Sequence, residues 1–281
     1  MKPYFEEDGI TIYHGDCREI IPCLPVAFCR GCGVPLADES ILAIHVAAGH
    51  AIGPFCDLVL TDPPYGIGEN AYRVANRGKL AKTTDYGDFD WDKEPASGEE
   101  IELTLKAAPK AIIWGGNYFD LPPSRGWLVW DKQNGDNCFA DCELAWSNLE
   151  MSVRVFRFLW NGMIRAGEWR DKPRVHPTQK PDELMHWCLS FEPDAFRVID
   201  PFMGSGTTLV SAKKQNREAI GIEIEEKYCE IAAKRLAQKV LQFCEGRVGR
   251  ATDRAFCLKS CARVVELYGS LPKISEENED G

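Results

Sequence analysis

The stretch Asp57-Leu58-Val59-Leu60-Thr61-Asp62-Pro63-Pro64-Tyr65 combines a short apolar run with a carboxylate, two prolines and an aromatic ring. The apolar run has the length and composition of a buried β-strand. Proline fixes its own φ angle and has no backbone N–H, so it is not expected inside that strand. The sequence therefore predicts a strand that presents Asp62, Pro63, Pro64 and Tyr65 at its carboxyl end.

Similar apolar runs alternate with helical patterns on both sides of this stretch. Strands are expected at Ile10–Tyr13, Asp57–Thr61, Ala111–Trp114, Trp127–Trp130, Val153–Leu159, Arg197–Ile199 and Ala219–Ile222. Helices are expected at Ser97–Ala107, Pro181–Leu189, Thr207–Gln215 and Lys227–Phe243. Such alternation predicts an α/β fold with a mostly parallel sheet and helices on both faces.

Composition narrows the class of protein. Of the 281 residues, 44% are hydrophobic, which is ordinary for a globular protein with a sizeable core. No apolar run has the length of a membrane span, and Met1–Asp8 lacks the features of a signal peptide, so a cytoplasmic protein is expected. The net charge of −10 argues against generalised electrostatic binding to nucleic acid but leaves room for a local basic face.

A second informative stretch begins at Asp200, after the predicted strand Arg197–Ile199, and has glycines at 204 and 206 before a helix. A strand, a tight glycine turn and a helix N-terminus form a cradle for the charged part of a nucleoside cofactor. A phosphate-binding Walker loop would need a lysine in this turn. A dinucleotide fingerprint would need a third glycine where Leu209 stands.

Glu223 narrows the choice of cofactor. It follows the predicted strand Ala219–Ile222, and a carboxylate there can accept hydrogen bonds from both hydroxyls of a ribose. A two-glycine loop followed by such a carboxylate predicts a binding site for S-adenosylmethionine rather than an ordinary glycine-rich turn without a ligand.

Asp62 and its neighbours suit the binding of a planar amine. The exocyclic amine of adenine or cytosine is a poor nucleophile because its lone pair is delocalised into the ring. Asp62 and the carbonyl of Pro63 can accept its two hydrogens and bend the nitrogen towards sp³ geometry, while Tyr65 stacks on the base. A base inside a duplex cannot be reached in this way, so it must be flipped out.

The two stretches, their order along the chain and the intervening segment His176-Pro177-Thr178-Gln179-Lys180-Pro181 resemble the β-class of DNA amino-methyltransferases. The resemblance covers about residues 9–243, apart from 27–55. It implies a Rossmann-like, circularly permuted fold that uses S-adenosylmethionine to methylate double-stranded DNA. Asp62, where cytosine-N4 enzymes commonly have serine, favours adenine N6 as the acceptor.

The resemblance also assigns roles to individual residues. Those implied to bind S-adenosylmethionine are Asp16, Thr178, Lys180, Asp200, Phe202, Gly204, Gly206, Thr207 and Glu223. Glu223 would hold the ribose, and Asp16 would lie beside the adenine. Thr178 and Lys180 would lie near the methionine end. The residues implied to form the catalytic site are Asp62, Pro63, Pro64 and Tyr65.

Composition and the resemblance together divide the chain into regions. Residues 1–244 would form the methyltransferase domain, residues 66–180 its target-recognition region, and residues 245–281 a C-terminal extension that is partly disordered. Within residues 151–180, basic residues outnumber acidic ones and alternate with aromatic rings, which suits DNA contacts. They are Arg154, Arg157, Arg165, Arg170, Lys172, Arg174 and Lys180, with Phe156, Phe158, Trp160 and Trp169. The alternative is a solvated basic face over core aromatics.

An insertion, residues 27–55, carries the pattern Cys29-x2-Cys32-x12-His45-x4-His50. This spacing is typical of a Cys2His2 zinc finger, so these four residues are predicted to bind a structural zinc ion. Leu36 and Leu42 fall where such a finger keeps its core residues, and a helix is expected from Asp38 to Gly49. The alternative is a set of reduced core cysteines with incidental histidines.

The predicted helix of the insertion contains no arginine or lysine, although a DNA-reading finger needs long polar donors on that face. The insertion is therefore expected to dock on protein or to support a loop near Asp62. Twelve cysteines without a secretion signal argue for thiols and metal ligands rather than disulfides.

Three alternatives to an adenine-N6 enzyme stay open. A cytosine-N4 enzyme and an RNA or protein-glutamine methyltransferase would share the fold. A non-catalytic zinc-finger DNA-binding protein would not bind S-adenosylmethionine, and the intact Asp62 and Glu223 argue against it. The sequence also leaves open whether the enzyme is a homodimer, and whether a partner endonuclease accompanies it in restriction–modification or it is an orphan.

Overall fold

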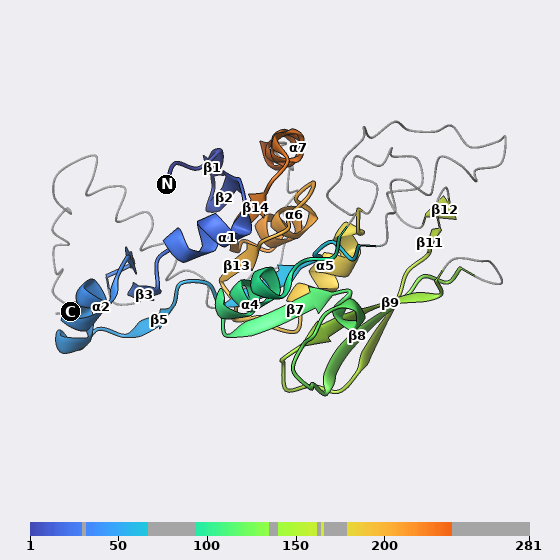
Figure 1. Ribbon diagram of the computed structural model, residues 1–281, viewed down its shortest axis with the longest axis horizontal. Coiled ribbons are helices and arrows are strands. Elements are labelled where there is room, and N and C mark those ends of the chain that lie inside the picture. The colour runs from blue at the N-terminus through green and yellow to red at the C-terminus, as the bar shows by residue number, and fades with distance from the viewer. Residues whose placement is uncertain (30–31, 67–93, 135–139, 162–163, 166–178, 238–281) are drawn as a thin grey trace, which may run out of the picture. The chain divides into compact units, whose positions relative to one another are not determined.

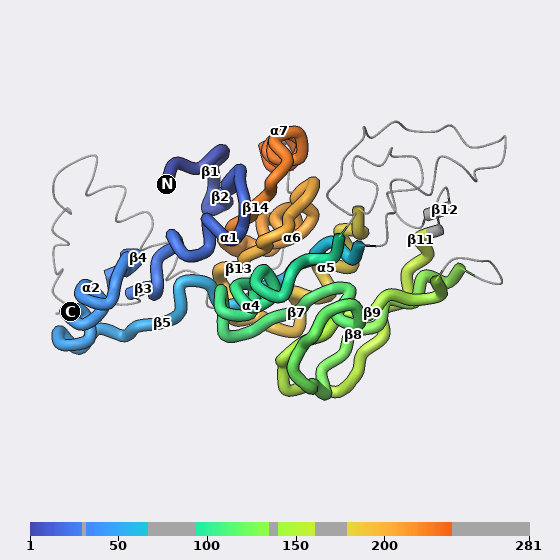
Figure 2. Tube along the Cα trace, in the orientation of Figure 1, coloured from blue at the N-terminus to red at the C-terminus, as the bar shows by residue number. Residues whose placement is uncertain are grey.

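The computed structural model describes residues 1–29, 32–66, 94–134, 140–161, 164–165 and 179–237 (Figures 1 and 2). The chain divides into two compact units, Met1–Gln238 and Lys239–Gly281, and the described residues all belong to the first. The predicted C-terminal extension, residues 245–281, lies outside the described residues, as does much of the predicted recognition region.

A nine-stranded mixed sheet forms the framework of the first unit (Figure 1). In spatial order its strands are β1 (Phe5–Glu7), β2 (Ile10–His14), β14 (Glu218–Glu223), β13 (Arg197–Asp200), β6 (Leu58–Thr61), β7 (Lys110–Trp114), β9 (Cys142–Ser147), β8 (Gly126–Asp131) and β10 (Arg154–Arg157). The strands from β2 to β7 in this order are parallel, and so are β8 and β10. β1 and β9 run antiparallel to their neighbours. The predicted α/β fold with a mostly parallel sheet is confirmed.

Parallel pairing brings the carboxyl ends of four adjacent strands to one edge of the sheet. β2 pairs with β14, β14 with β13, and β13 with β6. Asp16, Glu223, Asp200 and Asp62 end or follow these strands, so residues far apart in the sequence meet along this edge. Ligand sites of open α/β sheets form outside the carboxyl ends of their strands.

Helices cover both faces of the sheet. They are α1 (Cys17–Ile20), α4 (Gly98–Lys106), α5 (Asp182–Leu189), α6 (Thr207–Lys214) and α7 (Glu226–Ala237), with the 3-10 turns η1 (Ile21–Cys23) and η2 (Gly116–Tyr118). Helices α5, α6 and α7 share a core with Leu58, whereas α1 and α4 share a second core with Val59. These consecutive residues of β6 face opposite cores because side chains alternate along a strand. Within the described ranges, no helix has both the length and the apolar surface needed to cross a bilayer.

The predicted strands and helices correspond to observed elements, with ends shifted by one or two residues. For the last helix this holds up to Ala237, and its predicted continuation to Phe243 lies outside the described residues. Strands β1 and β9 were not predicted. Strand β9 inserts between β7 and β8, so its burial depends on these two strands rather than on the spacing of its own apolar residues. A two-stranded sheet of β11 (Trp160–Asn161) and β12 (Ile164–Arg165) was also not predicted.

The insertion forms a small module of three strands and one helix. Its elements are β3 (Ala27–Cys29), β4 (Val34–Leu36), α2 (Glu39–Ala47) and β5 (Ile52–Pro54), with the sheet order β4-β3-β5. Asp38 caps α2 by accepting hydrogen bonds from the backbone N–H groups of Ser40 and Ile41. Leu36 is fully buried, and Leu42 packs against the same small core. The predicted helix and its core positions are confirmed.

The module contacts the large sheet at the amino end of β13. The guanidinium of Arg197 lies 4.7 Å from the ring centroid of Phe28 and 4.6 Å from that of Phe55. Its Nη1 also donates a hydrogen bond to the carbonyl of Phe55. Asp62 follows the opposite, carboxyl end of the adjacent strand β6. The described contacts agree with the expectation that the module docks on protein. Residues 67–93, which follow Asp62, lie outside the described residues, so support of a loop there stays a prediction.

Candidate functional site

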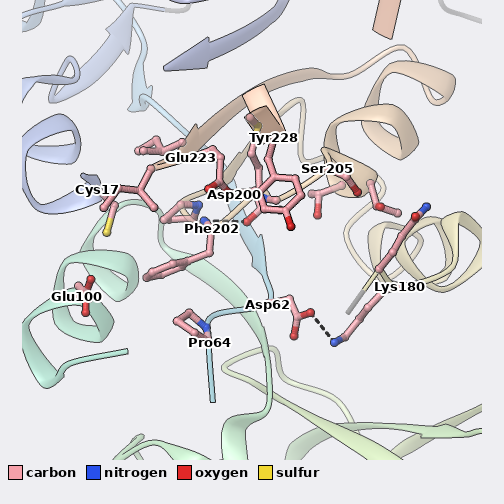
Figure 3. A pocket seen from close by; sticks show the side chains of 18 of the residues that line it. Cys17, Asp62, Pro64, Glu100, Lys180, Asp200, Phe202, Ser205, Glu223 and Tyr228 are labelled. Atoms are coloured by element: carbon pink, nitrogen blue, oxygen red, sulfur yellow. Dashed lines mark hydrogen bonds and ion pairs between the residues drawn. The ribbon is translucent and has the colours of Figure 1, made fainter. Parts of the chain in front are cut away.

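A cavity of about 220 Å³ opens at the carboxyl edge of the sheet (Figure 3). The predicted site residues that line it are Asp16, Asp62, Pro64, Lys180, Asp200, Phe202, Gly204, Thr207 and Glu223. The structure thus brings the predicted amine motif and the predicted cofactor loop to one cavity. Thr178 lies outside the described residues.

Glu223 ends β14 and faces this cavity (Figure 3). Its Oε2 accepts a hydrogen bond of 2.9 Å from the N–H of Gly204, and its Oε1 accepts one of 2.8 Å from the N–H of Glu225. Burial raises its pKa to about 7, although both hydrogen bonds oppose the rise. Each carboxylate oxygen can accept a second hydrogen bond, so Glu223 can still receive two hydroxyl groups.

Asp200 ends β13 and is held by the neighbouring strand. Its Oδ1 accepts a hydrogen bond of 2.6 Å from the hydroxyl of Thr61 and one of 3.2 Å from the N–H of Phe202. Burial raises its pKa to about 6 in spite of these bonds. Because Thr61 precedes Asp62, this contact joins the cofactor loop to the amine motif.

Gly204 and Gly206 have different roles in the loop. The N–H of Gly204 binds Glu223, and its backbone lines the cavity. Gly206 does not line the cavity. It precedes α6 in the left-handed conformation, with φ 78°, and an added Cβ would lie 2.8 Å from the Cβ of Ala232. The turn and the packing of α7 therefore require glycine at this position.

Asp62, Tyr65 and the buried Lys180 form a hydrogen-bonded group at the cavity. The Oδ1 of Asp62 accepts a hydrogen bond from the hydroxyl of Tyr65. Its Oδ2 accepts one of 2.5 Å from the Nζ of Lys180 (Figure 3). This Nζ also lies 3.2 Å from the Tyr65 oxygen, and only 5% of the Lys180 side chain is exposed. Pro63 is buried and, like Tyr65, does not line the cavity.

Glu143, which the sequence did not single out, completes this group. It lies on β9, and its Oε2 is 3.1 Å from the Nζ of Lys180. Its Oε1 forms an ion pair with Lys132, which follows β8. The sequence carries no signal for this residue, because β9 reaches Lys180 only through its place between β7 and β8.

The charges of this group depend on one another. Burial raises the pKa of Asp62 above its ordinary value, and the Lys180 ammonium opposes the rise. Burial disfavours the ammonium as well, but Asp62 and Glu143 outweigh burial and raise the pKa of Lys180. Burial acts to raise the pKa of Glu143, yet Lys180 and Lys132 lower it to about 2. The ionisation of Asp62 therefore relies on the neighbouring cation.

The turn after β7 holds the ring of Tyr65. Tyr118 stacks on this ring with centroids 4.9 Å apart and an interplanar angle of 12°. Gly115 has φ +68°, and a Cβ added there would lie 2.0 Å from the Cε1 of Tyr65. No side chain fits at position 115 unless the Tyr65 ring moves.

In the described part of the predicted DNA-reading region, the aromatic rings belong to the core. Phe156 and Phe158 pack against the main core, and Trp160 is only 6% exposed. The alternative of core aromatics holds for Trp160, whereas Phe156 and Phe158 are half-buried rings for which contact with DNA stays a prediction. Arg154 and Arg157 of β10 are exposed. Trp169, Arg170, Lys172 and Arg174 lie outside the described residues.

Four donor atoms converge in the small module. They are the Sγ atoms of Cys29 and Cys32 and the Nδ1 atoms of His45 and His50, all within 4.8 Å of one another. Cys29 Sγ lies 3.4 Å from His50 Nδ1, Cys32 Sγ lies 3.3 Å from His45 Nδ1, and the two Nδ1 atoms are 3.2 Å apart. Tetrahedral zinc would space such ligand atoms roughly 3.2–3.8 Å apart. The sulfur atoms, 3.0 Å apart, are closer than this spacing.

Several residues at the cavity were given no role by the sequence analysis. They are Cys17, Glu100, Gln179, Met185, Pro201, Met203, Ser205, Thr208, Ile222, Ile224 and Tyr228. Pro201 and Ser205 belong to the predicted cofactor loop, so the loop itself was the signal that could have found them. Cys17, Glu100 and Tyr228 come from separate helices, and only the fold brings them to the cavity (Figure 3).

The chain is similar to known DNA methyltransferases. A family model for N6/N4 methyltransferases, described as DNA methylase, matches residues 125–234. The type II methyltransferase M.HinfI of Haemophilus influenzae is 40% identical, over 85% of this chain and 71% of that enzyme. The type II methyltransferase M2.LlaDCHI of Lactococcus lactis subsp. cremoris is 24% identical, over 84% of this chain and 92% of that enzyme. Among solved structures, the PvuII DNA methyltransferase (cytosine-N4-specific) gives a TM-score of 0.45 at 15% identity, over 94% of this chain and 95% of that chain.

Proposed function

The chain belongs to the N6/N4 family of DNA methylases, and we propose that it transfers a methyl group from S-adenosylmethionine to the N6 amine of a flipped adenine in double-stranded DNA. The observation that carries this proposal is the presence of Asp62 and Glu223 in one cavity. Asp62 suits the binding of an amine, and Glu223 suits the binding of a ribose. A methyltransferase needs both ligands held side by side, because orientation supplies much of its rate.

The side chains at the cavity fit S-adenosylmethionine. Glu223 retains acceptor capacity for the two ribose hydroxyls, and Phe202 offers an aromatic ring to the adenine of the cofactor. Asp16 lines the same cavity from the loop after β2. Bound there, the cofactor would supply an electrophilic methyl group on its sulfonium. The chain's own part is to bind both ligands and to exclude water.

Asp62 would hold the target amine. Its carboxylate and the carbonyl of Pro63 can accept the two N–H hydrogens, which favours an sp³ nitrogen with an exposed lone pair. Tyr65 would stack on the base, which must leave the duplex to reach it. Direct transfer needs no covalent enzyme intermediate, so no cysteine is required as a nucleophile. Adenine N6 is preferred over cytosine N4 because position 62 is aspartate rather than serine.

The order of the strands supports the circularly permuted form of the fold. Strand β6 leads to the Asp62 motif, and its neighbour in the sheet, β13, leads to the cofactor loop. The Asp62 motif comes first along the chain, which is the order that the resemblance associates with the permuted fold. The type II relatives support a role in restriction–modification. A cytoplasmic location and a DNA-reading role for residues 66–180 are part of the same proposal.

The small module is proposed to bind one structural zinc ion. Cys29, Cys32, His45 and His50 provide two thiolates and two imidazoles, a donor set that suits tetrahedral zinc. The buried core of the module consists of Ala27, Cys29 and Leu36 alone among the described residues. A core of this size contributes little stability, so an ion that joins β3 to the end of α2 would hold the module together.

Transfer of labelled methyl groups to competing acceptors tests the proposed function. The wild-type protein is expected to label double-stranded DNA, and digestion of the product should release N6-methyladenine. Asp62→Ala is expected to lower the rate by about 100-fold or more, while S-adenosylmethionine still binds in calorimetry. Asp120→Ala, at an exposed carboxylate outside the cavity, is the matched control.

Each alternative has its own outcome in this experiment. Equal labelling by wild type and Asp62→Ala would refute the role of Asp62. Release of N4-methylcytosine would assign the cytosine-N4 reaction, and preferred labelling of RNA or of protein glutamine would replace DNA as the substrate. Absence of S-adenosylmethionine binding would indicate a non-catalytic DNA-binding protein.

A further inference from the structure

The place proposed for the target amine is filled by the protein's own cation. The Nζ of Lys180 lies 2.5 Å from the Oδ2 of Asp62 and 3.2 Å from the oxygen of Tyr65. It also lies 5.5 Å from the centroid of the Tyr65 ring, on which the base would stack. An incoming amine nitrogen must approach the same carboxylate and the same ring. The ammonium must therefore move before the amine can bind.

Glu143 offers the ammonium a second acceptor. Its Oε2 forms an ion pair of 3.1 Å with the Nζ of Lys180, longer than the 2.5 Å contact of the same Nζ with Asp62. The other oxygen of Glu143 is engaged in an ion pair with Lys132, which fixes the carboxylate in place. A carboxylate oxygen can accept a shorter, better directed hydrogen bond from the same ammonium, so Glu143 can hold Lys180 more tightly than it does here.

We propose that Glu143 is a positioning residue that draws the Lys180 ammonium away from Asp62 when the target amine arrives. This inference rests on the proposed function, because it concerns how the same site admits its substrate. Nζ already lies within 3.1 Å of both carboxylates, so a small rotation of the side chain completes the exchange. The buried ammonium stays paired throughout, and it stays close enough to Asp62 to keep that carboxylate ionised.

Glu143→Gln tests the role of the second acceptor. Glutamine keeps the shape of the side chain and an oxygen for Lys132, but it removes the charge that attracts Lys180. The single-turnover rate constant, measured at a subsaturating DNA concentration, is expected to fall by about tenfold or more. The affinity for S-adenosylmethionine should be unchanged. Glu143→Asp, which restores the charge, should recover part of the loss. Glu150→Gln, at an exposed position in the turn after β9, is the matched control and should behave as wild type.

A double-mutant cycle shows whether Glu143 acts through Lys180. In a Lys180→Met background the ammonium is absent, so Glu143→Gln should change the single-turnover rate by less than about twofold. An equal loss in both backgrounds would overturn the inference, as would an unchanged rate in Glu143→Gln. Lost binding of S-adenosylmethionine would also overturn it, because Glu143 does not line the cavity. The proposed function is judged separately, by DNA methylation in the wild type and its loss in Asp62→Ala.

Discussion

The hydroxyl of Thr61 donates a hydrogen bond of 2.6 Å to the Oδ1 of Asp200, across the parallel pair β6 and β13. Thr61 is followed directly by Asp62, and Asp200 begins the loop that leads to Gly204. One buried contact therefore links the residue proposed to hold the target amine to the loop proposed to hold the cofactor. The relative position of the two proposed ligands depends on it.

Thr61→Val should loosen this link without changing the volume of the side chain. Removal of the hydroxyl leaves a buried carboxylate with one hydrogen bond fewer, so the pKa of Asp200 should rise further. The free energy of unfolding should fall by about 1–2 kcal/mol in urea titrations. Binding of S-adenosylmethionine should weaken in calorimetry. Thr11→Val on β2, at a position that does not line the cavity, serves as control. Unchanged stability and affinity in Thr61→Val would contradict the proposed link.

Gly115→Ala should displace the Tyr65 ring, because the added Cβ would lie 2.0 Å from the Cε1 of Tyr65 in a backbone conformation that already disfavours alanine. Methyl transfer to DNA should fall by about 100-fold, as expected when a substrate contact shifts by an ångström. The affinity for S-adenosylmethionine should be retained, since Tyr65 does not line the cavity. Gly98→Ala, where an added Cβ meets nothing within 4 Å, is the control and should be active. A fully active Gly115→Ala would show that the ring position is not critical.

Glu223→Gln should reveal the cost of burying this carboxylate. In the folded protein burial raises the pKa of Glu223 from 4.5 to about 7, so between these values the native state binds more protons than the unfolded state. The tighter binding of this proton stabilises the folded protein at acid pH, and the stabilisation is lost as pH rises towards about 7. Glu223→Gln should therefore be more stable than wild type at pH 8, by about 1–2 kcal/mol, and lose this advantage near pH 5.

The affinity for S-adenosylmethionine should also depend on the ionisation of Glu223, but it should rise with pH where the stability falls. The affinity of the wild type for S-adenosylmethionine should increase as pH rises through about 7, because the ionised carboxylate accepts both ribose hydroxyls. Glu223→Gln should bind more weakly and lack this dependence. Calorimetry across pH 6–8 checks the affinity, with exposed Glu7→Gln as control. Identical pH profiles in wild type and Glu223→Gln would rule out Glu223 as the ribose ligand.

Cys29→Ser should release the metal of the small module. Metal analysis of the wild-type protein is expected to find about one zinc per chain, and the variant should have lost it along with part of its thermal stability. Methyl transfer should largely persist, since the module contacts the amino end of β13 while the cavity lies at the carboxyl edge. Cys23→Ser changes an exposed cysteine outside the four-residue cluster and should keep its zinc. A wild-type protein purified without zinc would refute the site.

Local patterns predicted the elements and the motifs because their determinants are close in sequence. The run Leu58–Thr61 is a strand and the prolines after Asp62 end it, as the sequence predicts. The helix of the module begins after Asp38, whose side chain caps it. The four predicted zinc ligands fall within one short insertion, so their spacing alone predicted that they converge.

The tertiary structure alone decided which distant residues meet. β9 enters between β7 and β8, and this pairing carries Glu143 to Lys180. The sequence predicted Trp160 as a DNA contact, but the fold buries its ring in the main core, against which Phe156 and Phe158 also pack. Strand order and burial depend on how the whole chain packs, whereas strand ends, caps and ligand spacing depend on a few neighbouring residues. For this reason the sequence by itself could predict an amine-binding role for Asp62, and only the fold revealed that the Lys180 ammonium lies against its carboxylate.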